Sequence, residues 1–435
     1  MLDVLKNRVY RHLFAAQVIA LIGTGLATVA LGLLAWDLAG DDAGAVLGTA
    51  LAIKMIAYVT LAPIAGAFAD RVPRRVMLVT LDLIRASVAV ALPFVSEVWH
   101  IYVLIFLLQA ASAGFTPTFQ ATIPDVLPDE GDYTRALSLS RLAYDLENLL
   151  SPMLAAALLT VVSFPILFGG TVIGFLASAA LVLTVTLPSP RPAAPGGIWD
   201  RTTRGIRIYL ATPRLRGLLA LNLAVAAAGA MVIVNTVVMV KGGFGLGERD
   251  VALALGAFGG GSMLAALVLP RMLDRLPDRP VMIAGAGIAT IGTALGPLIG
   301  SFGGLVALWL VTGFGYSMAQ TPTGRLLRRS ARPEDRPAVF AAQFALSHAC
   351  WLLTYPLAGW LGPAIGLGAT FAVMAALAAA GAAMALQLWP SPDSGTFAHT
   401  HYDLPADHPH LKDHGTPHSH PFVIDDLHPR WPADG

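Results

Sequence analysis

The feature that most constrains the fold is a series of twelve apolar stretches distributed over a chain of 435 residues. A helix needs about 20 predominantly apolar residues to cross a bilayer. With 13% charged residues and a mean hydropathy of +0.67, the chain cannot cover a water-facing surface. An average soluble protein carries roughly 25% charged residues. The sequence therefore predicts an all-α membrane protein with twelve transmembrane helices. They are expected at 13–36, 46–69, 76–96, 101–122, 142–162, 165–187, 217–240, 250–270, 281–300, 303–324, 338–361 and 366–388.

The distribution of Lys and Arg predicts the orientation of these helices. Of the 28 Lys and Arg residues, 24 fall at the amino end, in every second loop, or in the carboxyl tail. Positively charged loops stay on the cytoplasmic side of a membrane. Both termini are therefore expected in the cytoplasm, with the multi-pass chain in a plasma membrane (the bacterial inner membrane) and the lipid bilayer as its partner.

Short motifs recur along the chain at a constant spacing. The segment 70–75 recurs at 274–279, an offset of 204, and Thr116-Pro-Thr118 recurs as Thr321-Pro-Thr323, an offset of 205. These offsets predict two parallel six-helix repeats, residues 1–187 and 217–388, joined by a cytoplasmic linker at 188–216 and followed by a tail at 389–435. Two parallel repeats are typical of a class of secondary transporters.

A loop between the second and third predicted helices carries a family resemblance. Gly66-Ala-Phe-Ala-Asp70-Arg71-Val-Pro-Arg74-Arg75 resembles the cytoplasmic signature of the major facilitator superfamily, with Pro73 in place of the usual glycine. The resemblance covers about residues 10–388 and implies the fold of that family. Asp70 and the arginines are expected to form an ion-pair latch at a cytoplasmic gate. The alternative is that the arginines only anchor the loop by their charge. The second copy supplies Asp274, Arg275 and Arg279.

Several classes of function are excluded by what the sequence lacks. No Walker A loop and no GxGxxG pattern occurs, so neither an ATPase nor a dinucleotide enzyme is expected. A net charge of +1 gives no reason to expect nucleic acid as a partner. The stretch 147–156 partly resembles the helix 5 signature of antiporters, so protons are the expected coupling ion. No permanently bound cofactor and no obligatory protein partner is expected.

Polar residues inside the predicted spans are candidates for the transport path, because they are costly in a membrane. Helix 5 carries Asp145, Glu147 and Asn148, helix 2 carries Lys54, and helix 11 carries His348 and Cys350. A carboxylate near a His and a Cys could hold a divalent cation. The alternative is a set of structural ion pairs, Lys54 with Glu147 and Asp82 with Arg85.

The tail is rich in histidine. It holds eight of the eleven histidines of the chain: His399, His401, His408, His410, His414, His418, His420 and His428. No apolar periodicity is present, so the tail is expected to be disordered. Imidazole with carboxylate suits nickel, cobalt, zinc or copper(II). The tail is therefore a candidate metal ligand, and the alternative is a solvated tail with incidental histidines.

Several stretches add a second, narrower resemblance. Tyr10–Gln17, Thr116–Gln120, Asp407–His410 and Phe422–His428 are similar to segments of the bacterial nickel-resistance permeases. The resemblance implies export of nickel or cobalt and metal resistance. Two rival functions stay open: a drug or siderophore exporter whose tail is regulated by metal, and a metal-responsive membrane sensor that does not transport.

Overall fold

The computed structural model describes most of the chain. The described residues are 2–69, 72–129, 132–133, 135–136, 139–140, 143, 151, 153–188, 198–273, 275–332, 335–391, 393, 396–400, 418–425, 427–428 and 430–431.

The first half is built from long helices that begin and end at recognisable signals. They are α1 (Arg8–Ala39), α2 (Ala43–Ala69), α3 (Arg74–Ala91), α4 (Val98–Val126) and α6 (Pro165–Leu183). The side chain of Asn7 caps α1 by accepting from the backbone N–H of Tyr10. Gly40, with φ of 54°, ends α1 in a conformation that favours glycine. The predicted fifth span lies mostly outside the described residues.

The second half repeats this plan. Its helices are α7 (Ile198–Ala211), α8 (Pro213–Val237), α9 (Glu248–Leu273), α10 (Asp278–Leu295), α11 (Phe302–Gln320), α12 (Thr323–Arg329), α13 (Arg336–Ile365) and α14 (Leu367–Leu388). α8 continues into a π-helical turn at Val238–Gly243. Short 3-10 turns lie at Leu2–Lys6, Gly40–Asp42, Leu92–Phe94 and Gly296–Leu298. Helix α7 lies inside the predicted cytoplasmic linker, for which sequence analysis proposes no secondary structure.

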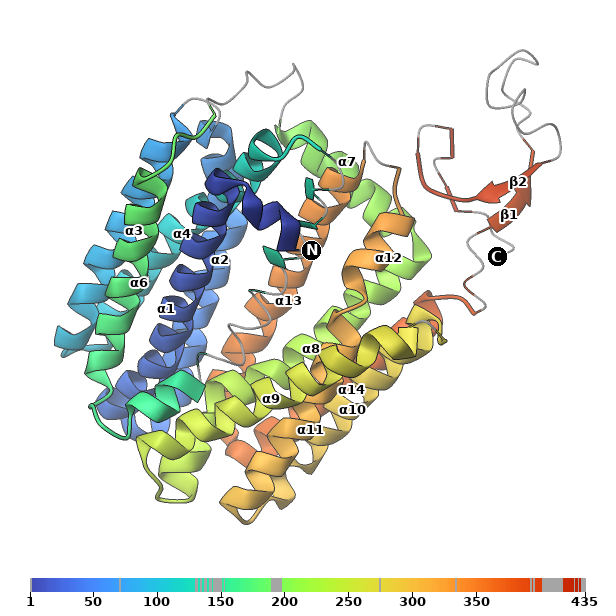
Figure 1. The fold of residues 1–435 in the computed structure, drawn as a ribbon. Helices are drawn as coiled ribbons and strands as arrows, with labels where there is room; N and C mark the ends of the chain where they lie inside the picture. The colour runs from blue at the N-terminus through green and yellow to red at the C-terminus, as the bar shows by residue number, and fades with distance from the viewer. Residues whose placement is uncertain are drawn as a thin grey trace.

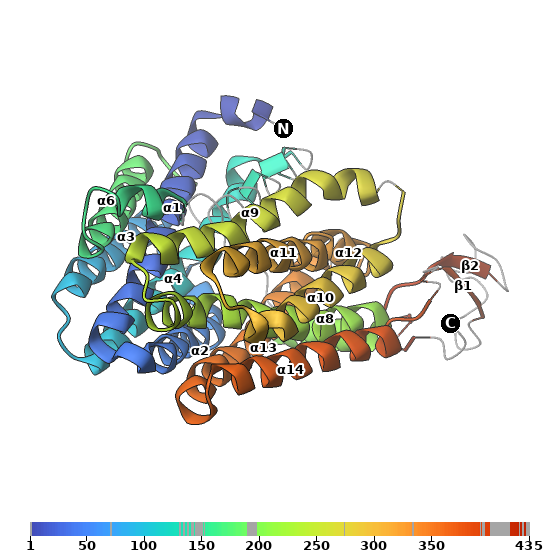
Figure 2. The same ribbon diagram turned by 90° about the horizontal axis from the view of Figure 1, so that it is seen from below.

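The structure confirms the predicted fold class. Ten helical segments are long and apolar enough to cross a membrane, with α1 and α2 counted together as Arg8–Leu61. Every predicted span except the fifth coincides with a described helix. Figures 1 and 2 show two helical bundles with α13 beside the first. We call the end that carries the amino terminus, α7 and α12 the basic end, and the other the opposite end.

Within its described parts the tail is folded, which corrects the expectation of disorder there. Strands β1 (Thr396–His399) and β2 (His418–Pro421) pair antiparallel, with His399 opposite His418. Phe397, Phe422 and Trp431 form an aromatic cluster, with ring centroids 5.3–6.0 Å apart. These three rings are too far apart in sequence to form a periodic pattern, so the pattern-based expectation missed the core they make. Figure 2 shows the strands beyond the ends of the helices.

Candidate functional site between the two halves

The two halves make contact at the opposite end of the molecule. Asp37, at the end of α1, lies 3.7 Å from the ammonium group of Lys241 in the turn after α8. A Cβ atom on Gly242 would lie 2.8 Å from the ring of Trp36, so the backbone passes directly against the indole. An ion pair and a tight packing contact thus join the halves there.

Helices α2 and α13 cross at glycines, and this crossing also joins the halves. A Cβ on Gly48 would lie 2.6 Å from the carbonyl oxygen of Tyr355, and one on Gly359 would lie 2.4 Å from the carbonyl oxygen of Gly44. Real Cβ atoms do not approach so closely, so the backbones touch without side chains between them. Trp360 donates from Nε1 to Thr49 Oγ1 at 2.8 Å beside the crossing.

Further along the same two helices, two of the predicted transport-path residues come together. The ring of His348 on α13 lies 5.6 Å from that of Tyr58 and 3.9 Å from that of Phe344. Its Nδ1 lies 2.7 Å from the carbonyl oxygen of Phe344. Lys54 lies four residues before Tyr58 on α2, on the same face of that helix. Lys54 and His348 therefore share the interface between the halves near the middle of α2.

Cys350 does not share this position. It follows His348 by two residues, and residues two apart on a helix do not face each other. Its side chain is buried. Asp145, Glu147 and Asn148 lie outside the described residues, so their predicted roles stay predictions.

Sequence analysis missed a row of aromatic residues in the second half. Phe258, Tyr316, Trp351 and Tyr355 contact one another in that order, with centroids 5.3, 6.5 and 4.9 Å apart. A Cβ on Gly229 would lie 2.5 Å from the Trp351 ring, so this glycine makes room for the indole. The row comes from three helices, and no spacing within one helix could indicate it.

A pair of buried amides was also missed, although the internal repeat could have revealed it. Gln17 on α1 and Asn222 on α8 are 205 positions apart, the offset of the repeat. Ser140 donates to Gln17 Oε1 at 3.0 Å, and Gln320 donates to Asn222 Oδ1 at 3.0 Å. Each half thus carries a hydrogen-bonded amide at the same place in its first helix.

The predicted gate signature of the first half contains an ion pair that was not expected. Arg74, which starts α3, is 7% exposed and pairs with Asp125 near the end of α4 at 2.5 Å. Arg75 donates to the carbonyl oxygen of Leu183 at the end of α6. Gly66 belongs to α2, while Asp70 and Arg71 lie outside the described residues. The latch through Asp70 stays a prediction.

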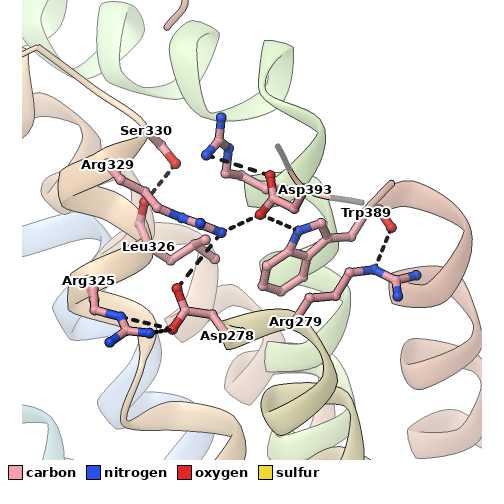
Figure 3. A network of polar contacts seen from close by, with 9 residues as sticks. Asp278, Arg279, Arg325, Leu326, Arg329, Ser330, Trp389 and Asp393 are labelled. Carbon is pink, nitrogen blue, oxygen red and sulfur yellow. Dashed lines mark hydrogen bonds and ion pairs between the residues drawn. The ribbon is translucent and has the colours of Figure 1, made fainter. Parts of the chain in front are cut away.

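The second copy of the signature is built with the opposite charge. Asp278 occupies the place of Arg74 and accepts from Nε of Arg325 at 2.9 Å and from its Nη2 at 2.5 Å. Arg329 lies 3.8 Å from the same carboxylate. Arg279 donates to the carbonyl oxygens of Trp389 and Leu386 at 2.8 and 3.1 Å, as Arg75 does at the end of α6. Figure 3 shows this network. Arg275 is exposed, and Asp274 lies outside the described residues.

The predicted pair of Asp82 with Arg85 is confirmed. Both side chains are buried, and they are ion-paired within α3. Ser178 donates to the Asp82 carboxylate at 2.7 Å, and the Arg85 guanidinium lies 4.0 Å from the centroid of the Phe115 ring. The pair is enclosed by α3, α4 and α6, which supports the structural interpretation.

The histidines of the tail are only partly described. His399, His418 and His420 belong to the two strands, and His401, His408, His410 and His414 lie outside the described residues. His428 is buried, and its Nδ1 lies 2.9 Å from Asp425. Among the described residues, no three His, Cys, Asp or Glu side chains come close enough together to hold a metal ion.

Two parallel repeats of membrane-spanning helices, with polar residues between them, are the architecture of a membrane transporter. The family model of the Major Facilitator Superfamily matches residues 13–240 and 218–402. The chain belongs to the major facilitator superfamily.

Relatives and solved structures agree with this membership. The chain is 24% identical over 181 residues to macrolide efflux protein A of Streptococcus pyogenes, covering 40% of this chain and 44% of that protein. It is 26% identical over 152 residues to macrolide efflux protein A of Enterococcus faecalis, covering 33% and 47%. Each match thus spans less than half of the relative.

The fold is also similar to solved transporter structures. An inward-facing, unoccupied bacterial homolog of the human lysosomal transporter Spinster has a TM-score of 0.70 at 14% identity, covering 87% of this chain and 96% of that one. The nucleoside transporter NupG has a TM-score of 0.67 at 15% identity, covering 88% and 100%. At these identities the likeness concerns the fold.

Proposed function

We propose that this transporter exports a divalent transition metal, nickel or cobalt, from the cytoplasm in exchange for protons and so confers metal resistance. The observation that carries the proposal is the tail, with eight of the eleven histidines in its last 43 residues, Asp393–Gly435. Imidazole and carboxylate groups without thiolates favour nickel, cobalt or zinc over soft metals.

The distribution of positive charge supports a cytoplasmic location for the basic end. Twenty-four of the 28 Lys and Arg residues belong to the loops and termini predicted at this end, which the positive-inside rule assigns to the cytoplasm of a bacterial inner membrane. The ion pair Asp37–Lys241 and the glycine crossing hold the halves together at the opposite end. In the proposed cycle, export requires the Asp37–Lys241 pair to separate and the basic ends of the two halves to approach each other.

The polar groups between the halves would carry the exchange. Lys54 and His348 lie on the two helices that cross at the interface, and Asp145 and Glu147 would supply carboxylates from the predicted fifth span. A neutral imidazole and a carboxylate can each accept either a proton or a divalent metal, which is the requirement for competition between the two ions. Full export by the variants Asp145→Asn and Glu147→Gln would exclude both carboxylates from the path.

The decisive experiment uses purified protein in liposomes that contain a pH-sensitive dye. Addition of nickel or cobalt to the side that exposes the basic end should drive metal uptake, accompanied by proton release from the lumen. Calcium should have no effect, since it prefers oxygen ligands. Metal-independent proton release, or none, would contradict the proposal.

A drug exporter of the same fold is the second candidate. Two observations favour it: the macrolide efflux relatives, and the aromatic row from Phe258 to Tyr355, which offers flat apolar surfaces to an organic molecule. Growth tests separate the candidates. Deletion of the gene should sensitise cells to nickel in one case and to macrolides in the other.

A further inference from the structure

Asp393 is the first charged residue after α14. Its carboxylate contacts residues at the basic end of the second half. One carboxylate oxygen lies 3.7 Å from Nη1 of Arg214 at the start of α8. The other accepts from Nε1 of Trp389 at 2.9 Å and is ion-paired with Arg329, which also approaches Asp278 (Figure 3). Asp393 is therefore part of the same network as the second signature copy.

The buried guanidinium of Arg214 requires a negative charge nearby, and the Asp393 carboxylate supplies it. Its side chain is 4% exposed, and Nε and Nη2 have no hydrogen-bond partner within the described part of the chain. It also lies in the first turn of α8, where the helix dipole disfavours a cation. The ring of Trp431, near the other end of the tail, lies 5.1 Å from the guanidinium. Both ends of the tail thus converge on one buried arginine.

A second anchor holds the far end of the tail. Asp425, 7% exposed, pairs with Arg332 at 2.5 Å and accepts from the backbone N–H groups of Leu427 and His428. His428 lies against the same carboxylate and against the ring of Phe422, with ring centroids 4.8 Å apart. His428 therefore belongs to this anchor.

The two anchors enclose the strand pair. His399 stands directly opposite His418 in the register, and His420 follows on β2. Directly opposed residues of an antiparallel pair have Cβ atoms about 4.5–5.5 Å apart. Bringing the two ends of a chain segment together costs conformational entropy. Here the anchors at Asp393 and Asp425 already hold those ends together.

We propose that anchoring of the tail to Arg214, Arg329 and Arg332 and binding of a divalent metal between β1 and β2 stabilise each other. The inference rests on the proposed function, because it assigns a regulatory role to the metal-binding tail. A bound metal tightens the strand pair and hence the anchors, and the anchors in turn brace the Asp278 network. Reciprocity then requires that loosening an anchor weakens metal binding by the same factor.

The test uses Arg332→Gln in the full-length protein, which loosens an anchor while leaving every tail residue unchanged. Arg328→Gln is the matched control: it removes an exposed arginine four residues away with the same loss of charge. Nickel binding is measured by competition with a metal indicator dye, with protein truncated after Pro390 as the background. We expect Arg332→Gln and Asp425→Asn to lower the tail affinity for nickel about 5-fold or more, and Arg328→Gln to leave it unchanged.

A second readout follows the tail itself. Nickel should slow its cleavage by protease in the wild type and in Arg328→Gln, and less so in Arg332→Gln. Equal nickel affinity in the wild type and Arg332→Gln would overturn the coupling while leaving metal export intact. Absence of nickel binding by the tail of every variant would overturn the coupling together with the proposed role of the tail in metal capture.

Discussion

At the scale of single residues, the two signature copies each form an ion pair at the start of a helix, but with opposite charges. Arg74 pairs with Asp125 in the first half, whereas Asp278 pairs with Arg325 in the second. The first pair joins the start of α3 to the end of α4, and the second joins the start of α10 to α12, the short helix that follows α11. What the two halves share is an ion pair between two helices. The residue at the start of the first helix is positive in the first half and negative in the second.

Exchanging the charges of the first pair tests this directly. Arg74→Gln should lower the free energy of unfolding by about 3 kcal/mol, because it leaves a largely buried carboxylate without its cation. The double variant Arg74→Asp with Asp125→Arg copies the polarity of the second half and should recover much of that loss. Thermal unfolding in detergent measures both, with exposed Arg275→Gln as the control. A double variant no more stable than Arg74→Gln would contradict the symmetry.

At the scale of elements, the crossing of α2 and α13 decides how the halves meet. Gly44, Gly48 and Gly359 allow backbone contact that larger residues would prevent. Small residues are the usual means of close helix approach in membranes. The crossing is therefore more sensitive to added volume than to a loss of polar groups.

We expect Gly359→Ala to reduce the transport rate at least several-fold while leaving insertion intact, because its Cβ would lie 2.4 Å from the carbonyl oxygen of Gly44. Gly368→Ala on α14 is the matched control, since no atom lies within 4 Å of its added Cβ. Uptake into vesicles is compared at equal protein content. Wild-type uptake by Gly359→Ala would show that the crossing is not tightly packed during transport.

The tail is the other element with a separable role. Truncation after Pro390 and truncation after Gly395 both remove every tail histidine, but only the longer chain keeps Asp393. Both should raise the nickel concentration for half-maximal export, as expected if the tail gathers metal. Both also remove the Asp425 anchor, but the shorter chain should have the lower unfolding temperature of the two, because it leaves Arg214 without its carboxylate as well. Equal unfolding temperatures would remove Asp393 from the structural account.

At the scale of the whole molecule, local sequence patterns predicted the helices. The features that were missed depend on contacts between residues far apart in the sequence. Apolar stretches predicted every described membrane helix, and a spacing of three predicted the Asp82–Arg85 pair. The pair of Arg74 with Asp125, the helix α7 and the folded tail were missed. Each depends on partners more than ten residues away or on other elements, which local spacing does not encode. The candidate site was found only in part, through Lys54 and His348.

The pH dependence of the whole assembly separates capture from anchoring. Burial alone would raise the pKa of the Asp425 carboxyl, but hydrogen bonds from His428 and the charge of Arg332 outweigh it and hold the pKa below its usual range. A lowered pKa gives stability that is present above the unfolded-state pKa, about 3.9, and is lost as pH falls through the folded-state value. The Asp425 anchor should therefore persist from pH 8 to 5.

Metal capture should fail earlier. An unperturbed histidine has a pKa of about 6.5 and binds metal only when neutral. Nickel binding by the tail should weaken steeply below about pH 6, while protease resistance of the metal-free tail stays constant to pH 5. Measuring both on one sample checks the prediction. Loss of both at the same pH would mean that the anchor also titrates near neutrality.

The contact of bare backbones where α2 crosses α13 also has a mechanical consequence. Interlocked side chains must separate before two helices can rotate against each other. Helices that touch through glycine backbone have no such side chains to separate. We expect the crossing to serve as the point about which the two halves rotate. We expect the main energetic cost of each transport cycle to be the separation of the Asp37–Lys241 ion pair and the rearrangement of the surrounding lipid. Membrane thickness and fluidity should then set the turnover rate more strongly than changes of side-chain size elsewhere in the core.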